Sequence, residues 1–292
     1  MVKKYTDMET SKCDKAILIT GCSSGIGLAV AKGLQQRGYR VFATARKQQD
    51  VESLIQAGFE SLLLDLDDSS CIHQAVTEVL ERTDGQLYGL FNNGGFALAG
   101  AVEDLSREAI RAQFETNLFG WLELSNLIIP VMRKQGYGRI IQNSSILGMI
   151  PYHYRGAYVA SKFAVEGLFS TLRLELRDTS IHICLIEPGP IASHIRQNSL
   201  KALKKYIRIE DSVHQQAYNN ILGRLETKGP VMKSTLPPEA VLKRVIHCLE
   251  SRKPKIRYYV TTPTYIVGFL RRVLPYRLLD KLLSTSASSG KR

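Results

Sequence analysis

The sequence predicts a doubly wound α/β fold, a parallel sheet of about seven strands with helices on both faces. Short apolar runs rich in β-branched residues recur along the chain, and each is followed by a stretch long enough for a helix. This alternation is typical of parallel strands joined by crossover helices. The chain has 292 residues, of which 44% are hydrophobic, enough to bury one large core. Because no internal repeat or low-complexity block divides it, we expect residues 1–292 to form a single domain.

Seven apolar runs are expected to form the strands, namely residues 16–20, 40–45, 61–65, 88–92, 139–143, 181–186 and 255–260. Two helices are clear from their patterns. Residues 106–133 follow an N-cap signal at Ser106, and residues 158–177 repeat large apolar side chains at helical intervals. Residues 193–237 have mixed polarity and no strand signal. We expect them to be an insertion that covers the ligand crevice beyond the strand ends.

The excess positive charge lies entirely in the last third of the chain. Of a net charge of +12, residues 1–199 carry 20 Lys and Arg against 21 Asp and Glu, whereas residues 200–292 carry 19 against 6. The basic part contains no motif that reads RNA or DNA and no interleaved stacking aromatics. We therefore expect no nucleic-acid partner.

Cysteine usage and the N-terminus bear on the compartment. The five cysteines are scattered and show no Cys-x-x-Cys or His-paired metal spacing, which predicts a reduced protein without a structural metal. The N-terminal segment is polar and lacks the apolar stretch of a secretory signal. Cytoplasmic residence is the expectation, with membrane association as an addition to it.

The tail, residues 264–292, is apolar but interrupted by Arg271, Arg272 and Pro275, so it is too short and too charged to span a bilayer. A helix there would gather its leucines on one face, at Leu278, Leu279, Leu282 and Leu283. Two interpretations remain open. The basic amphipathic tail makes a peripheral contact with an anionic membrane, or it packs on the enzyme or against another subunit.

A glycine-rich turn follows the first predicted strand and opens a helix, in the run Thr20-Gly21-Cys-Ser-Ser-Gly25-Ile-Gly27. Phosphate oxygens require close approach of the backbone and the positive end of a helix, and residues without Cβ permit both. Strand before and helix after predict a Rossmann-type dinucleotide site. Its expected contacts are Gly21, Ser23, Ser24, Gly25, Ile26 and Gly27.

The end of the second predicted strand bears on the choice of cofactor. An NAD enzyme places a carboxylate there against the ribose 2′-hydroxyl, but this chain has Arg46 and Lys47. A guanidinium binds a 2′-phosphate bidentately, whereas a carboxylate repels it. The sequence therefore favours NADP(H) over NAD(H). The alternative is that these two cations form a solvated turn.

Tyr158 and Lys162 lie four residues apart and hence on one face of a helix. A neighbouring cation favours the phenolate and brings the titration of a tyrosine closer to neutral pH, so that it can exchange a proton with a substrate oxygen. Tyr-x-x-x-Lys also occurs as an ordinary surface pair. Ser145, at the end of the fifth predicted strand and thirteen residues upstream, strengthens the catalytic interpretation.

These motifs, in this order, resemble the short-chain dehydrogenase/reductase family from about Lys15 to Ser193. The resemblance implies that Ser145 hydrogen-bonds the substrate oxygen and that Tyr158 supplies or removes the proton. Lys162 would hold the nicotinamide ribose and lower the tyrosine pKa, and Asn117 would anchor a water-linked proton relay. Two alternatives remain: Ser144 competes with Ser145, and an asparagine inside a long helix can simply mark a kink.

Further cofactor contacts follow from the same resemblance. Asp65 and Leu66, after the third strand, would meet the adenine, and Asn93 and Gly94, after the fourth, the adenosine ribose. The family usually has alanine where this chain has Gly94. After the sixth strand, Pro188, Gly189, Ile191 and Ser193 would line the nicotinamide end, with Ser193 in place of the commoner threonine.

The expected function is an NADP(H)-dependent oxidoreductase that moves a hydride between the nicotinamide and a small apolar aldehyde, ketone or alcohol. The amino-acid sequence around the first two predicted strands resembles that of the family branch with 17β-hydroxysteroid dehydrogenases, retinol dehydrogenases and bacterial NADP-dependent aldehyde reductases. An aldehyde or ketone reductase is the first expectation, and a hydroxysteroid or retinol dehydrogenase the alternative. An alternative of another class is a non-catalytic dinucleotide-binding regulator. The family resemblance also implies a homodimer or homotetramer.

Overall fold

A seven-stranded parallel sheet in the order β3-β2-β1-β4-β5-β6-β7 forms the centre of the molecule, which confirms the predicted fold class. The computed structural model describes residues 15–227, 229 and 232–288. Most of the polar N-terminal segment, Cys13 and the last four residues lie outside this range. The strands are β1 (Ala16–Ile19), β2 (Arg40–Ala45), β3 (Glu60–Leu63), β4 (Gly89–Asn92), β5 (Gly138–Asn143), β6 (Ile181–Glu187) and β7 (Arg257–Tyr259).

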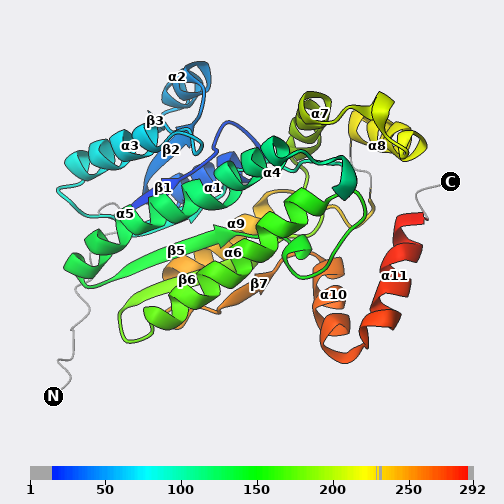
Figure 1. The fold of residues 1–292 in the computed structure, drawn as a ribbon. Coiled ribbons are helices and arrows are strands. Elements are labelled where there is room, and N and C mark those ends of the chain that lie inside the picture. Colours follow the sequence, from blue (N-terminus) through cyan, green and yellow to red (C-terminus); the bar gives the residue numbers. More distant parts are fainter. Residues whose placement is uncertain (1–14, 228, 230–231, 289–292) are drawn as a thin grey trace.

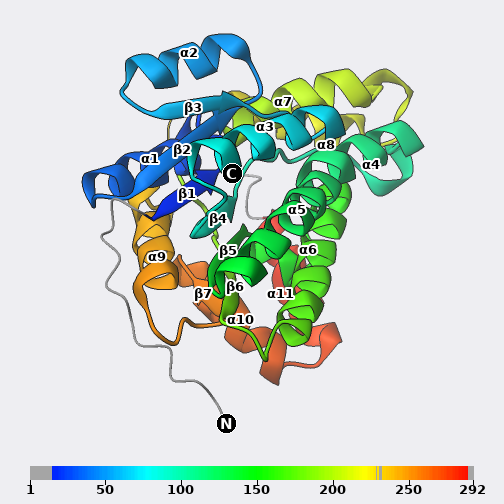
Figure 2. The same ribbon diagram turned by 90° about the vertical axis from the view of Figure 1, so that its left-hand side faces the viewer.

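Helices cover both faces of the sheet, as Figures 1 and 2 show. One face carries α3 (Ser69–Arg82), α5 (Gly120–Gln135) and α6 (Gly156–Glu175), and the other carries α1 (Gly25–Gln36), α2 (Gln48–Gln56) and α9 (Glu239–Glu250). Strand β1 is buried at all four positions. This is why the strands are continuous apolar runs in the sequence and do not alternate with polar residues.

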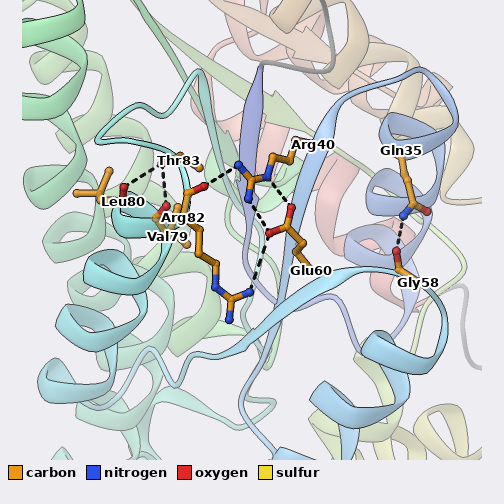
Figure 3. A network of polar contacts seen from close by, with 8 residues as sticks. All are labelled: Gln35, Arg40, Gly58, Glu60, Val79, Leu80, Arg82 and Thr83. Carbon is orange, nitrogen blue, oxygen red and sulfur yellow. Dashed lines mark hydrogen bonds and ion pairs between the residues drawn. The ribbon is translucent and has the colours of Figure 1, made fainter.

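Polar contacts tie β2, β3 and α3 together at the edge of the sheet where these two strands begin (Figure 3). The Arg40 guanidinium donates to the Glu60 carboxylate at 2.6 and 2.9 Å and to the Arg82 carbonyl at 2.7 Å. Both partners of the ion pair are about one third exposed, at 35% each. A pair this exposed contributes about 0–1 kcal/mol, so packing dominates the stability of this edge.

The helix expected at residues 106–133 is not continuous. It consists of α4 (Arg107–Phe114), a π-helical turn (Glu115–Phe119) and α5, which extends to Gln135. Both polar atoms of the buried Asn117 side chain are bound by the Phe96 backbone in the loop after β4, and Gly120 lies so close to Leu66 that a Cβ would be 2.3 Å from its carbonyl oxygen. These tertiary contacts hold the wide turn, and π-helical turns of this kind are frequent at functional sites.

The insertion predicted at residues 193–237 folds into α7 (Ile195–Tyr206) and α8 (Gln215–Glu226). Both helices lie at the carboxyl edge of the sheet (Figure 1). Ile191 and Leu236 form an isolated parallel bridge that closes the base of this segment. The insertion therefore stands where ligands of open α/β sheets bind.

The tail forms α10 (Thr262–Val273) and α11 (Tyr276–Ser288). The leucine face expected on the tail is divided: Leu279 is buried, whereas Leu278 and Leu282 are half exposed. Among the described residues no helix is both long enough and apolar enough to cross a bilayer.

Candidate active site

A chain of polar contacts joins the carboxyl ends of β1, β4 and β5. The Asn93 backbone N–H donates to the Thr20 hydroxyl at 2.9 Å, and its side-chain amide donates to the Thr20 carbonyl, also at 2.9 Å. The Asn143 amide in turn donates to the Asn93 side-chain oxygen at 2.9 Å. The predicted contact Asn93 thus links the glycine-rich turn to the strand that leads to Ser145.

Tyr158 lies in the first turn of α6 and is only 9% exposed. Burial raises the pKa of its phenol, while a hydrogen bond with the Ser145 side chain and the charge of Arg155 lower the same pKa. From the sequence the lowering effect was expected of Lys162, whose ammonium lies 5.7 Å from the centre of the Tyr158 ring; that effect stays a prediction. Arg155, three residues before the tyrosine, is a further cation that acts on it and was not predicted.

Lys162 is buried and turned toward the sheet. Its ammonium donates to the Asn143 carbonyl at 2.8 Å and lies 4.3 Å from the centre of the Trp121 ring, against 5.7 Å from the centre of the Tyr158 ring. Burial lowers the pKa of Lys162 to about 7. The ammonium is therefore held by a carbonyl and an aromatic face, close to the Tyr158 ring.

The sequence did not single out Trp121. Its indole N–H donates to the Gly94 carbonyl at 2.8 Å, and its ring faces the Lys162 ammonium. Trp121 therefore connects two predicted site residues. In the sequence it reads as one apolar residue among many on a long amphipathic helix, and no spacing distinguishes it from the core.

Ser145 and Ser144 have different surroundings. The Ser145 hydroxyl accepts from the Leu147 backbone N–H at 3.1 Å, and the Ser145 side chain lowers the pKa of Tyr158. The Ser144 hydroxyl is buried and has no partner among the described residues. It lies toward Gly148, where a Cβ would come within 2.9 Å of it. The geometry therefore favours Ser145, the predicted serine.

Asn117 is fully buried in the π-helical turn. Its amide nitrogen donates to the Phe96 carbonyl at 2.9 Å and to the Ser161 hydroxyl at 3.4 Å. Ser161 donates to the Tyr158 carbonyl at 2.8 Å. The side chain therefore fixes the loop after β4 against α6. The kink that the sequence left as an alternative is present, and it does not exclude a role in a relay.

The glycine-rich turn has the shape required for close approach of a phosphate. Gly21 and Gly25 adopt positive φ, and a Cβ on Gly27 would lie 2.2 Å from the Gly21 carbonyl oxygen. Helix α1 begins at Gly25, and the Ser24 side chain makes no capping hydrogen bond. The N–H groups of the first turn are therefore left for an anion. Ser23 is exposed beside them, Ile26 is partly buried, and Ser193 lies against Gly25.

The other end of the expected dinucleotide site lies after β2 and β3. Arg46 is exposed at the end of β2, and among the described residues no carboxylate forms an ion pair with it. Its charge lowers the pKa of Asp67, which burial raises. Asp65 accepts from the Asp67 backbone N–H at 3.2 Å, and Leu66 is buried. The positions fit an adenosine with an anionic group near Arg46.

The turn after β6 brings the remaining predicted contacts to the same edge. Pro188 accepts from the Ile146 backbone N–H at 2.8 Å, so this turn is bonded to the residue after Ser145. Gly189 packs tightly, since a Cβ would lie 2.1 Å from the Thr261 hydroxyl. Ser193 donates to the Ile191 carbonyl at 3.4 Å.

A buried ionic group lies beneath this turn and was not predicted. Arg257 on β7 donates to the carboxylates of Glu187, at 2.6 Å, and Glu166. Glu187 is completely buried, and burial raises its pKa to about 7. Because Glu187 directly precedes Pro188, this ion pair holds the base of the turn. No group of three His, Cys, Asp or Glu side chains able to hold a metal ion occurs within the described part of the chain.

Known proteins are similar in sequence to the chain over most of its length. A family model described as short chain dehydrogenase matches residues 15–204. The uncharacterized oxidoreductase YbbO of Escherichia coli K12 is 42% identical over 284 residues, 97% of this chain and 99% of that protein. The NADPH-dependent 3-dehydrocapnine reductase of Ornithobacterium rhinotracheale is 30% identical over 274 residues, which are 91% of this chain and 94% of that protein. Human 17-beta-hydroxysteroid dehydrogenase type 1 is 30% identical over 257 residues, which are 84% of this chain and 77% of that protein.

A solved structure shows the same fold. A short chain dehydrogenase/reductase from Burkholderia phymatum, in complex with NAD, superposes with a TM-score of 0.73 at 24% identity and covers 90% of this chain and 94% of its own. The family model and the relatives confirm the resemblance inferred from the sequence motifs. The chain therefore belongs to the short-chain dehydrogenase/reductase family and is an oxidoreductase.

Proposed function

We propose that this oxidoreductase uses NADP(H) to reduce apolar aldehydes or ketones, with Tyr158 as the proton donor. The observation that carries the proposal is the pairing of the buried Tyr158 with Ser145, whose side chain lowers the pKa of the phenol, at the carboxyl edge of the sheet beside the buried Lys162. A buried phenol whose pKa is shifted by Ser145 and Arg155 favours a catalytic site over a non-catalytic dinucleotide-binding regulator, because shifted pKa values cluster at functional sites.

The residues that would hold the dinucleotide fall into three groups along the edge of the sheet. Gly21, Gly25 and Gly27, with Ser23, Ser24 and Ile26, would take the pyrophosphate on the open first turn of α1. Arg46, Asp65, Leu66, Asn93 and Gly94 would take the adenosine part, and Pro188, Gly189, Ile191, Ser193 and Lys162 the nicotinamide part. When bound, the cofactor supplies or accepts the hydride.

The chain's own residues handle the proton. Tyr158 donates its hydroxyl proton to the substrate oxygen, and Ser145 hydrogen-bonds the same oxygen and fixes its position. The phenolate that remains is stabilised by Ser145 and by the charge of Arg155, the two groups that lower the tyrosine pKa. Lys162, with a pKa near 7, is able to take up and release a proton at neutral pH, and Asn117 anchors the π-helical turn beside it.

Two observations support NADP(H). Arg46 is exposed at the position that binds a 2′-phosphate, without a carboxylate ion-paired to it in the described residues. A relative that aligns over 91% of this chain is named as NADPH-dependent. The fold alone does not distinguish NADP(H) from NAD(H), because a solved structure with a similar fold is a complex with NAD. The sequence similarity to a 17-beta-hydroxysteroid dehydrogenase keeps hydroxysteroids as the second substrate class.

A panel of aliphatic aldehydes, aromatic ketones, retinal and ketosteroids tests the proposal, with NADPH and NADH absorbance followed separately. We expect turnover of at least one apolar carbonyl, with a higher kcat/KM for NADPH. Arg46→Ala should reduce this preference by about 10- to 100-fold, the value of one charge-assisted hydrogen bond of about 1.5–3 kcal/mol. Lys47→Ala, with a neighbouring exposed cation, is the matched control. No turnover of any carbonyl would favour the regulator, and equal use of NADH would overturn the cofactor assignment.

A further inference from the structure

A basic groove of about 240 Å³ lies between α9, β7 and α10, and none of the proposed cofactor or catalytic residues lines it. Its cations come from all three elements and their flanks, and three tyrosines and a histidine complete the wall. The residues that matter are Arg244, Lys255, Arg257, Arg272, Tyr259 and Tyr265. No acidic side chain lines the groove. Such a cluster attracts an anion, because like charges gathered on one surface are otherwise unfavourable.

The cations of this basic groove differ in availability. Arg257 is already neutralised by Glu166 and Glu187. Arg244 contacts the Tyr265 hydroxyl at 3.3 Å, and within the described residues no ion pair engages Arg244, Lys255 or Arg272. Three cations are therefore left to bind a ligand, and a phosphate group presents oxygens that suit them.

An apolar ridge, formed by Ile266, Phe269 and Val273, lies on the same helix. These side chains are 53, 64 and 54% exposed, and their spacing places them on one face of α10. The opposite face is packed, since Gly268 lies so close to the Tyr259 ring that a Cβ would be 2.5 Å from it. Tyr265 and Arg272, two turns apart, put the basic groove along the flank of the ridge.

A second copy of the chain fits this face poorly. In a two-fold dimer whose axis passes through the groove, the cations of one copy would face the cations of the other. Strand addition at the sheet edge is also blocked, because α10 lies over β7 with the Tyr265 and Tyr259 rings 5.4 Å apart. An anionic phospholipid surface meets both halves of the patch: phosphodiesters complement the groove, and the acyl boundary takes the ridge.

We propose that α10 docks the enzyme on an anionic phospholipid surface, with the basic groove on lipid phosphates and the apolar ridge in the interface. This attachment does not depend on the proposed reaction. In this proposal the part of the tail that contacts the membrane is α10 with the basic groove beside it, and the leucines of α11 contribute less.

Vesicle flotation of the full chain tests the proposal, with phosphatidylglycerol/phosphatidylcholine vesicles against phosphatidylcholine alone, at low and high salt. We expect binding to the anionic vesicles only, and less binding at high salt. Lys255→Glu with Arg272→Glu should reduce the partition coefficient by at least about fivefold per removed charge. Ile266→Ser with Phe269→Ser should reduce it without changing the salt dependence.

The matched control is Arg133→Glu with Lys134→Glu, two exposed cations at the end of α5, far from α10 in Figure 1. It makes the same change of net charge and should leave binding unchanged. An equal loss in this control would show that net charge alone drives attachment and would overturn the proposal. So would failure of the wild-type chain to float, unchanged binding of the ridge variant, or a sedimentation profile in which that variant converts a dimer to a monomer.

Discussion

Replacing Arg257 by methionine is expected to destabilise the protein far more at pH 8 than at pH 5. The guanidinium lies between two buried carboxylates, and its bond to the completely buried Glu187 is 2.6 Å long. Methionine removes the charge but keeps much of the volume. At pH 8 the loss should be about 3–5 kcal/mol in the free energy of unfolding, which is typical when one partner of a buried pair is removed.

The pH dependence follows from the pKa of Glu187, which is raised from 4.5 to about 7. A carboxyl with a raised folded-state pKa adds stability below its unfolded pKa, and this stability is lost as the pH rises through the folded value, about 3 kcal/mol for Glu187 in the wild-type protein. Arg257 lowers the pKa of Glu187, so removing Arg257 raises that pKa further and increases the loss at pH 8. At pH 5 Glu187 is protonated, so Arg257→Met should cost only about 1–2 kcal/mol, from lost hydrogen bonds.

Urea unfolding followed by far-UV circular dichroism at pH 5, 6, 7 and 8 measures these values. Arg40→Met is the matched control, because it breaks an arginine–glutamate pair in which both partners are 35% exposed and should cost about 0–1 kcal/mol. Equal losses for the two variants, or a loss for Arg257→Met that does not grow with pH, would refute the assignment of a buried ion pair beneath the turn after β6.

Two further predictions concern the site itself. Gly27→Ala would place a Cβ 2.2 Å from the Gly21 carbonyl oxygen, so the glycine-rich turn must open. The affinity for NADPH, measured by fluorescence titration, should fall at least about tenfold, or about 1.4 kcal/mol. Unchanged affinity would show that this turn is not part of the cofactor site. Arg155→Gln removes a charge that lowers the pKa of Tyr158, so the tyrosine titration, read from the pH profile of kcat/KM, should move to higher pH. Arg224→Gln, which removes a cation whose charge acts on Arg155, should leave the profile in place, and a shift of both variants would contradict the assignment.

The sequence predicted the sheet and the order of the motifs because both depend on local patterns. Apolar runs mark buried parallel strands, and Gly21, Gly25 and Gly27 mark a turn that only small residues allow. All seven strands lie where the runs are, within a few residues at each end. The spacing from Tyr158 also favoured Ser145 over Ser144, and the effect of the Ser145 side chain on the pKa of Tyr158 agrees with that prediction.

The features that the sequence did not predict depend on contacts between distant segments. The π-helical turn is held by Phe96, 21 residues from Asn117. The environment of Lys162 depends on the carbonyl of Asn143 and on the Trp121 ring, and the group beneath the turn joins Glu166, Glu187 and Arg257 across three elements. The partners of the Lys162 ammonium could not be predicted, because helical spacing shows which residues share a face but not where a long side chain ends.

The most direct test of the account measures turnover and NADPH affinity together in Tyr158→Phe, which removes one hydroxyl from a site that is otherwise kept. We expect kcat with the best carbonyl substrate to fall by about 10²- to 10⁴-fold, the usual contribution of a general acid. The Kd for NADPH should stay within about twofold of the wild-type value, a change in binding free energy well below the 1.4 kcal/mol that corresponds to a tenfold change. A variant that keeps more than about a tenth of the wild-type kcat, with the same affinity for NADPH, would contradict the role of Tyr158 as the proton donor.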